Sequence, residues 1–330
     1  MAGPVTSLAW SPDGQLLATT PGDALGTGTT ATIWTAAGGR VATLAGHTGA
    51  ITCMAWAPDS RTVASASRDG SVRLWDRTGR LVRALAGADP VLALAWSPDG
   101  SVLASGAVHF PAAAAGALVQ LPGVVRLWRP DGTRIASMGT ELTGGKFLNL
   151  AWSPDGTMLA AGAVDYRTWH ADGSPVGVLR TGGSPAWAMA WSPDSIAVAL
   201  GDENGSLQLV SPQGDSIAQT HYVGDVNSVS YSPNGTGIVI GQNTEVQFAH
   251  PDDLPGPVWK VPAAAQGRSA WSPDGQRLAI AISDGIALLN ADGSALADLG
   301  GCPGTPVAFA WAGNSLAATT DQGQLCVWHT

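Results

Sequence analysis

One short pattern recurs along the whole chain and limits the folds that the chain can adopt. It reads Trp-Ser-Pro-Asp-Gly in four copies and is a recognisable variant in four others, and the eight copies begin at Trp10, Trp56, Trp96, Trp152, Trp191, Tyr231, Trp271 and Trp311. Successive copies are separated by 46, 40, 56, 39, 40, 40 and 40 residues. A period near 40 residues is typical of chains that repeat one small structural unit. The sequence therefore predicts eight copies of such a unit.

Each copy has the pattern of β-strands. An apolar run of period two precedes the aromatic residue, as in residues 91–96, and predicts a first strand. Ser-Pro-Asp-Gly then predicts a tight turn, because proline presets φ and glycine accepts a positive φ. Two more apolar runs and a Gly-bearing turn into a short fourth run follow. We expect the aspartates in these turns to bond the local backbone: Asp13, Asp59, Asp99, Asp155, Asp194 and Asp274.

The second copy carries the most complete motif: Gly46-His47, Trp56-Ala-Pro-Asp, Ser65, Asp69-Gly70 and Leu74-Trp75-Asp76. On these residues the chain resembles the WD-repeat β-propellers, of a bacterial type with degenerate repeats, over nearly its whole length. The resemblance implies an all-β fold, an eight-bladed β-propeller of four-stranded antiparallel blades, with residues 1–330 as one propeller. It also implies a structural tetrad of His47, Ser65, Asp69 and Trp75, in which Ser67 is an alternative to Ser65. The TolB-like propellers, which also use Ser-Pro-Asp-Gly turns, are a second resemblance, although we see no signal peptide here.

The ends of the pattern leave the closure of the ring open. A first strand already begins at Val5, whereas residues 325–328 end a third strand. The last blade would then have three strands and an unpaired edge, which invites pairing with another chain. Three explanations stay open: a three-stranded blade, an edge covered by another chain, or a longer protein.

Composition excludes several classes of partner. The net charge is −9, with 16 Lys and Arg, so we expect no nucleic-acid binding. No long uninterrupted apolar run predicts a membrane span. The three cysteines (Cys53, Cys302 and Cys326) are scattered, which disfavours a disulfide framework or a zinc site and fits a reducing, cytoplasmic location.

No catalytic motif is present, so we assign no catalytic residue, metal site or cofactor. The pattern favours a non-catalytic scaffold that binds a protein or peptide at the mouth of the central channel. The alternative is a propeller enzyme, a hydrolase or lyase, or a TolB-like propeller with a small-ligand or metal site there. His109, His221 and Cys302 are the residues that such a metal site could use.

Exposed aromatic and charged residues are rare, so their positions indicate the binding surface. An apolar insertion at residues 108–122 and nearby residues of blades three to six should share the face opposite the Ser-Pro-Asp-Gly turns. The predicted partner-binding residues are His109, Phe110, Lys146, Phe147, Tyr166, Arg167, Trp187, His221 and Tyr222. In the alternative, the insertion plugs the channel and Trp187 and Phe147 pack against it.

Overall fold

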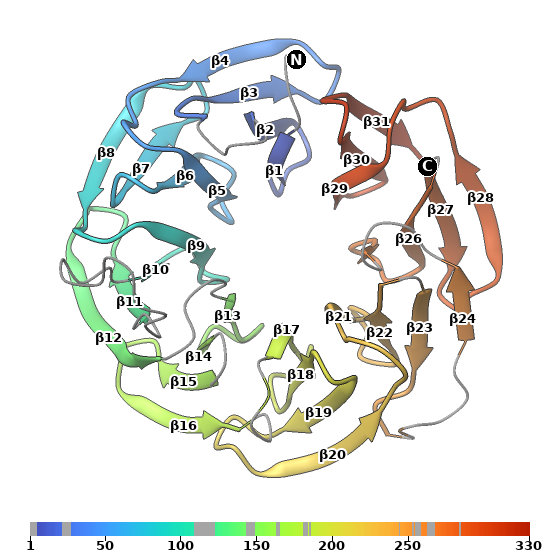
Figure 1. Ribbon diagram of the computed structural model, residues 1–330. Coiled ribbons are helices and arrows are strands. Elements are labelled where there is room, and N and C mark those ends of the chain that lie inside the picture. Colours follow the sequence, from blue (N-terminus) through green and yellow to red (C-terminus); the bar gives the residue numbers. More distant parts are fainter. Residues whose placement is uncertain are drawn as a thin grey trace, which may run out of the picture.

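A computed structural model confirms the predicted all-β, eight-bladed propeller (Figure 1). It describes residues 5–21, 28–108, 123–142, 149–162, 166–180, 184, 186–243, 245–252, 254, 259–262, 268–283 and 285–330. Seven blades are sheets of four antiparallel strands in chain order, and the eighth has three strands. No helix occurs in this described part of the chain.

The strands follow one another blade by blade. Blades 1 and 2 contain β1 (Val5–Trp10), β2 (Leu16–Pro21), β3 (Ala31–Thr35), β4 (Arg40–Leu44), β5 (Ile51–Trp56), β6 (Thr62–Ser67), β7 (Ser71–Asp76) and β8 (Leu81–Ala86). Blades 3 and 4 contain β9 (Val91–Trp96), β10 (Leu103–Val108), β11 (Gly123–Trp128), β12 (Arg134–Leu142), β13 (Asn149–Trp152), β14 (Met158–Gly162), β15 (Tyr166–His170) and β16 (Pro175–Leu179).

The second half of the ring repeats this order. Blades 5 and 6 contain β17 (Ala186–Trp191), β18 (Val198–Asp202), β19 (Ser206–Val210), β20 (Ser216–His221), β21 (Ser228–Tyr231), β22 (Ile238–Gly241), β23 (Glu245–Ala249) and β24 (Trp259–Pro262). Blades 7 and 8 contain β25 (Ser269–Trp271), β26 (Arg277–Ile282), β27 (Gly285–Asn290), β28 (Ala295–Leu299), β29 (Pro306–Ala312), β30 (Ser315–Thr320) and β31 (Leu325–His329).

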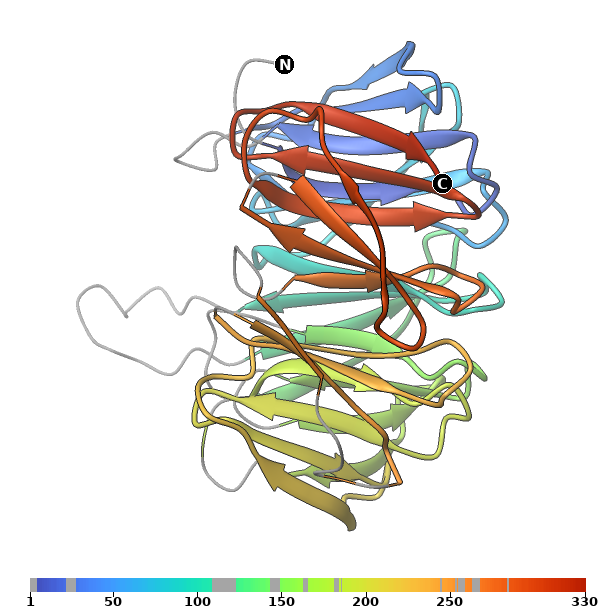
Figure 2. The same ribbon diagram turned by 90° about the vertical axis from the view of Figure 1, so that its right-hand side faces the viewer.

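The strands run between two faces of a disc, which Figure 2 shows from the side. Since neighbouring strands are antiparallel, the first-to-second turns of all blades and the third-to-fourth turns of the four-stranded blades share one face, here named the turn face. The second-to-third connections and the links between blades share the opposite face, here named the linker face. The first strand of each blade is innermost in the ring (Figure 1).

The Ser-Pro-Asp-Gly turns are held by their own side chains, as the sequence predicts. In the first turn, the Ser11 hydroxyl donates to Asp13 Oδ1 at 2.6 Å, and the backbone N–H of Gln15 donates to the same oxygen at 3.1 Å. Gly14 follows with φ +69°, a left-handed conformation that glycine adopts without strain. These aspartates therefore stabilise the turns.

In six of the eight blades the first-strand tryptophan donates a hydrogen bond to the blade before it. The indole N–H of Trp56 donates to the carbonyl of Ala9 at 3.1 Å, and that of Trp191 donates to Ala151 at 3.0 Å. Trp10 closes the ring in the same way, because its indole N–H donates to the carbonyl of Ala310 at 3.1 Å. These rings pack with apolar side chains of adjacent blades and form the core.

A disulfide joins Cys302 to Cys326, which overturns the inference that scattered cysteines disfavour such a bond. Cys302 lies in the link between β28 and β29, and Cys326 lies in β31. The cysteines are 24 residues apart, but the link into a blade passes beside its third strand, so the fold brings the two sulfur atoms together. The disulfide also removes the cysteine-based argument for a reducing compartment.

No membrane-spanning helix is found among the residues that the structure describes.

Candidate partner-binding surface

Trp187 is an exposed tryptophan on the innermost strand of blade 5. Its side chain is 41% exposed, whereas Trp191 on the same strand is buried. A β-bulge between Ala186 and Ala188 leaves Trp187 without a paired residue on β18. A bulge redirects one side chain and leaves the rest of the strand in register. Trp187 is therefore presented at the linker-face end of its strand.

The backbone of Trp187 is fixed from blade 4. The Asn149 side-chain amide donates to the carbonyl of Trp187 at 3.0 Å and to the hydroxyl of Tyr166 at 2.6 Å. The Tyr166 hydroxyl in turn donates to the carbonyl of Ala186 at 3.0 Å. This network ties blade 4 to blade 5 below the exposed ring.

Tyr166 belongs to that support and not to the exposed patch in which the sequence analysis placed it. Its side chain is fully buried, and burial raises the pKa of its hydroxyl to about 12. The residue lies three positions before Trp169, where Val72 lies relative to Trp75 and Val125 lies relative to Trp128, and both valines are buried. That spacing was the sequence signal for an inward position.

The link from blade 5 into blade 6 presents a second group on the linker face. His221 is exposed at the end of β20, and Tyr222 is half-buried against the core of blades 5 and 6. Val223 follows with 91% of its side chain exposed. Gln242 holds this link, because its side-chain amide donates to the carbonyl of Val223 at 2.7 Å. The sequence analysis did not identify Val223, although an apolar residue before Gly224 in a link was a usable signal.

Of the other predicted residues, one lies within the described ranges and four lie outside them. Arg167 is half-buried in β15. His109, Phe110, Lys146 and Phe147 lie outside the described residues. We therefore define the linker-face patch by the described residues Trp187, His221, Tyr222 and Val223, with Asn149 and Tyr166 as its support.

The four residues of the implied tetrad form one chain of hydrogen bonds inside blade 2. The Trp75 indole N–H donates to the Ser65 hydroxyl oxygen at 2.8 Å. Ser65 lies 2.8 Å from His47 Nε2, and Asp69 Oδ2 lies 2.8 Å from His47 Nδ1. A neutral histidine satisfies both contacts by accepting from Ser65 and donating to Asp69. Ser67 is not part of this chain, because its hydroxyl donates to the carbonyl of Gly49.

The tetrad makes blade 2 sensitive to acid. Burial lowers the pKa of His47 below 6.5. Burial opposes ionisation of Asp69, but hydrogen bonds from the Ser71 hydroxyl and the backbone N–H of Thr48 outweigh it and hold the pKa of Asp69 well below 3.8. Because both folded-state pKa values are lowered, both groups stabilise the fold at pH values above their unfolded pKa values. This contribution is lost as the pH falls from each unfolded pKa to the lower folded pKa.

We expect the Asp69→Ala substitution to lower the free energy of unfolding by about 1.5–3 kcal/mol at pH 7, because it removes a charged acceptor from buried donors. The difference in the free energy of unfolding between the variant and wild type should become smaller below about pH 4, where wild type itself loses the interaction. Urea unfolding at several pH values measures both effects. The exposed Asp298→Ala substitution is the control, and its effect should stay within about 0.5 kcal/mol. A pH-independent loss for Asp69→Ala would contradict the assignment.

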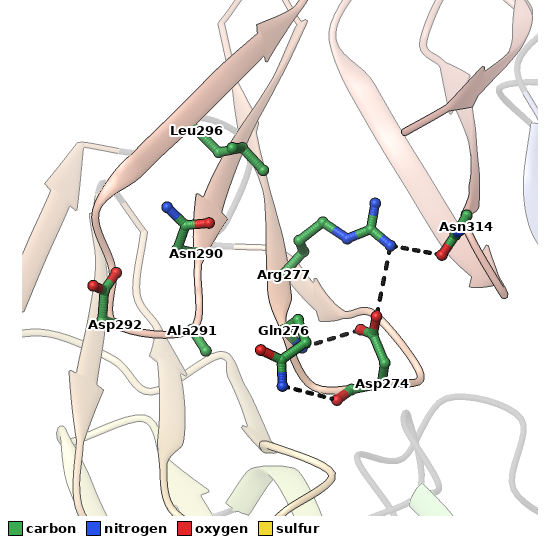
Figure 3. Close-up of a pocket in the computed structure, with 8 residues that line it drawn as sticks. All are labelled: Asp274, Gln276, Arg277, Asn290, Ala291, Asp292, Leu296 and Asn314. Atoms are coloured by element: carbon green, nitrogen blue, oxygen red, sulfur yellow. Dashed lines mark hydrogen bonds and ion pairs between the residues drawn. The ribbon is translucent and has the colours of Figure 1, made fainter.

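The turn face holds a wide polar pocket of about 600 Å³ between blades 7 and 8 (Figure 3). Its arginine is already engaged, since Arg277 donates to the Thr330 hydroxyl at 2.7 Å and to the Asn314 side-chain oxygen at 2.8 Å. Hydrogen bonds from Ser272 and Ser294 lower the pKa values of its carboxyls Asp274 and Asp292, respectively. Neither carboxyl is suited to donate a proton near neutral pH. The lining residues include no histidine.

The metal alternative also loses one of its ligands. Cys302 is bonded to Cys326 and has no thiol to offer, and His109 lies outside the described residues. In the described ranges, no three residues of the types His, Cys, Asp or Glu cluster as metal ligands.

Comparison with known proteins gives a family match in the first three blades. Residues 2–34, 38–76 and 79–108 match the model of the family described as WD domain, G-beta repeat. The chain is 25% identical over 209 residues to the intraflagellar transport protein 80 homolog of Mus musculus and 29% identical over 199 residues to Coronin-7 of Homo sapiens. These matches cover 62% and 56% of this chain but only 25% and 20% of the relatives. Both relatives are eukaryotic, so they give no support to the bacterial-type subclass that the sequence analysis expected.

Solved structures share the fold over the whole ring. Sqt1 of Chaetomium thermophilum, bound to the N-terminus of the ribosomal protein L10, superposes with a TM-score of 0.82 at 18% identity. The match covers 100% of this chain and 97% of that one. The sequence match to the WD domain, G-beta repeat model therefore lies within residues 2–108, whereas the likeness in propeller fold extends through all eight blades.

Proposed function

We propose that this protein is a non-catalytic scaffold that binds a protein or peptide through the linker face, across blades three to six. The observation that carries the proposal is Trp187, an aromatic side chain that is 41% exposed on the innermost strand of a rigid ring. Tryptophan is among the residue types that dominate the energetics of protein interfaces. Its backbone is fixed by Asn149, so binding would cost little ordering of the chain.

The neighbouring residues suit the same role. Val223 adds an exposed apolar side chain, and His221 adds an exposed polar one two residues before it. His109, Phe110, Lys146, Phe147 and Arg167 remain part of the proposed surface. The Sqt1 structure, which has the same fold, is bound to the N-terminus of another protein. A cytoplasmic location also remains a proposal, and the redox state of the Cys302–Cys326 pair in the cell would test it.

We expect Trp187→Ala to abolish partner capture while the fold stays intact. Tagged wild-type protein and the variant are incubated with extract of the native host, and bound proteins are quantified by mass spectrometry. Loss of an interface anchor costs about 2 kcal/mol or more, which is at least tenfold in affinity.

Ile196→Ala is the matched control, because Ile196 is 66% exposed and lies in a turn on the opposite face. The control should retain the partners that wild type captures. Equal capture by Trp187→Ala, with its melting temperature unchanged, would reject the linker face. A lowered melting temperature with unchanged capture would instead place Trp187 in the packing of a channel plug.

A further inference from the structure

The outer edge of blade 8 differs from that of every other blade. Figure 1 shows β31 as the outermost strand of its blade, next to blade 1. In the other seven blades a fourth strand pairs with the third, but no strand in the described ranges pairs with the outer edge of β31. Its outward backbone groups are therefore available for pairing.

Other blades show what this position normally holds. In blades 1, 2 and 3 the fourth strand places one apolar residue in a cluster with the third-strand tryptophan of the next blade. The pairs are Leu44 with Trp75, Leu85 with Trp128, and Met138 with Trp169. Blade 7 repeats the arrangement, since Leu299 and Trp328 pack against the same cluster. One apolar side chain thus fills the slot between successive blades.

Between blades 8 and 1 this slot is a groove of about 230 Å³. Its walls are apolar side chains of both blades, Leu17 and Trp34 from blade 1 and Leu325 and Val327 from β31. Trp34 is only half-buried, whereas Trp75, Trp128 and Trp169 are 3–6% exposed. The tryptophan that should receive a fourth-strand residue is therefore uncovered.

The space beside the glycines of the third-to-fourth turns also differs between blade 1 and the other blades. A methyl group added to Gly79 would lie 2.3 Å from Ala42 Cβ, and one added to Gly173 would lie 2.6 Å from Ala136 Cβ. Ala42 and Ala136 belong to the fourth strand of the preceding blade. Gly38 is the corresponding glycine in blade 1, and a methyl group there would meet nothing within 4 Å.

We propose that this edge binds an extended segment of a separate polypeptide, which adds to β31 as an antiparallel fourth strand and inserts one leucine-like side chain into the groove. The register follows from the other blades, where the inserted residue is paired with the third-strand residue three positions before the tryptophan, as Leu44 is with Ala31 and Leu85 is with Val72. The equivalent residue in β31 is Leu325, so the ligand leucine lies opposite Leu325. The residue two positions earlier in the ligand lies against Gly38, as Ala42 does against Gly79. This surface is distinct from the linker-face patch, so either proposal can fail alone.

The test uses a peptide taken from the chain itself. A fluorescent peptide of residues 39–46, which includes β4, is titrated against the whole protein at peptide concentrations up to the millimolar range. Binding is read by anisotropy and by hydrogen exchange of the β31 amides. We expect saturable binding with protection of β31, and at least tenfold weaker binding of the same peptide with L44D, because a charge cannot fill the apolar slot.

Two protein variants locate the site. Gly38→Asn keeps a residue that tolerates a positive φ and adds a side chain where the ligand must pass, so it should fold normally and weaken binding at least tenfold. Gly313→Asn is the control, because Gly313 also has a positive φ and open space but lies in the turn between β29 and β30, the two inner strands of blade 8. It should bind like wild type.

The same peptide, fused after Thr330 through a flexible linker, is the positive control for occupancy of the slot. It should protect β31 and raise the melting temperature, whereas the L44D fusion should not. Absence of binding by the free peptide at millimolar concentration, or equal binding to wild type and Gly38→Asn, would overturn the proposal. Protection of β31 by dimerisation of the protein, seen as a doubled mass in light scattering without peptide, would assign the edge to a second copy and also overturn it.

Discussion

Replacing Trp10 with alanine should lower the free energy of unfolding by about 3–5 kcal/mol, because the change leaves a large cavity in a buried interface. Trp10 is 8% exposed and packs with Leu17, Ala312 and Ala317 at the contact between blades 1 and 8. The substitution also removes the hydrogen bond from the Trp10 indole N–H to the carbonyl of Ala310. Among the described residues no fourth strand of blade 8 covers this contact, so we expect its stability to depend strongly on Trp10.

Urea unfolding followed by tryptophan fluorescence and by circular dichroism measures this effect. We propose that residues 1–330 form one domain, so both signals should change together in wild type and in Trp10→Ala. Trp187→Ala, at an exposed position, is the control and should change the stability by less than about 1 kcal/mol. A loss of similar size in both variants would show that Trp10 has no special role in closure.

Removal of the Cys302–Cys326 disulfide should be the second-largest effect, at about 2–4 kcal/mol. The bond closes a loop with a sequence separation of 24 residues and ties the link that enters blade 8 to β31, the outermost strand of that blade. Opening the bond gives the unfolded chain more freedom and loosens the edge strand of the ring-closing blade. Reduction by dithiothreitol, or the double substitution Cys302→Ser and Cys326→Ser, should lower the urea midpoint to the same extent.

The double variant supplies its own control, because dithiothreitol should not change its midpoint further. Cys53 should not interfere, since burial raises the pKa of its thiol to about 12 and thiolate is the form that attacks disulfides. If reduction leaves the wild-type midpoint unchanged, the disulfide does not stabilise blade 8.

Most of the fold was predictable because the repeat carries its own chemistry. The aromatic residue and the strand periods recur in each copy, and the Pro-Asp turn recurs in six of the eight, so they identify eight blades and the three strands of the last one. The tetrad of blade 2 was also identifiable, because His47, Ser65, Asp69 and Trp75 stand at the motif positions that the family uses.

The surface was less predictable, because exposure depends on contacts between blades. Tyrosine is a residue type that is common at interfaces, yet Tyr166 occupies the inward position three residues before Trp169 and is fully buried. The disulfide was missed for a related reason, since only the propeller brings Cys302 beside Cys326. Val223 was missed because the prediction rested on aromatic and charged residues, although its place before Gly224 in a link was a usable signal.

A photo-crosslinker placed on each face tests the central claim most directly. Trp187→p-benzoylphenylalanine reports the linker face, and Ile196→p-benzoylphenylalanine reports the turn face, both in intact cells of the native host. We predict a discrete protein adduct from position 187 and none from position 196. Adducts at position 196 with none at position 187 would contradict a scaffold that binds its partner through the linker face.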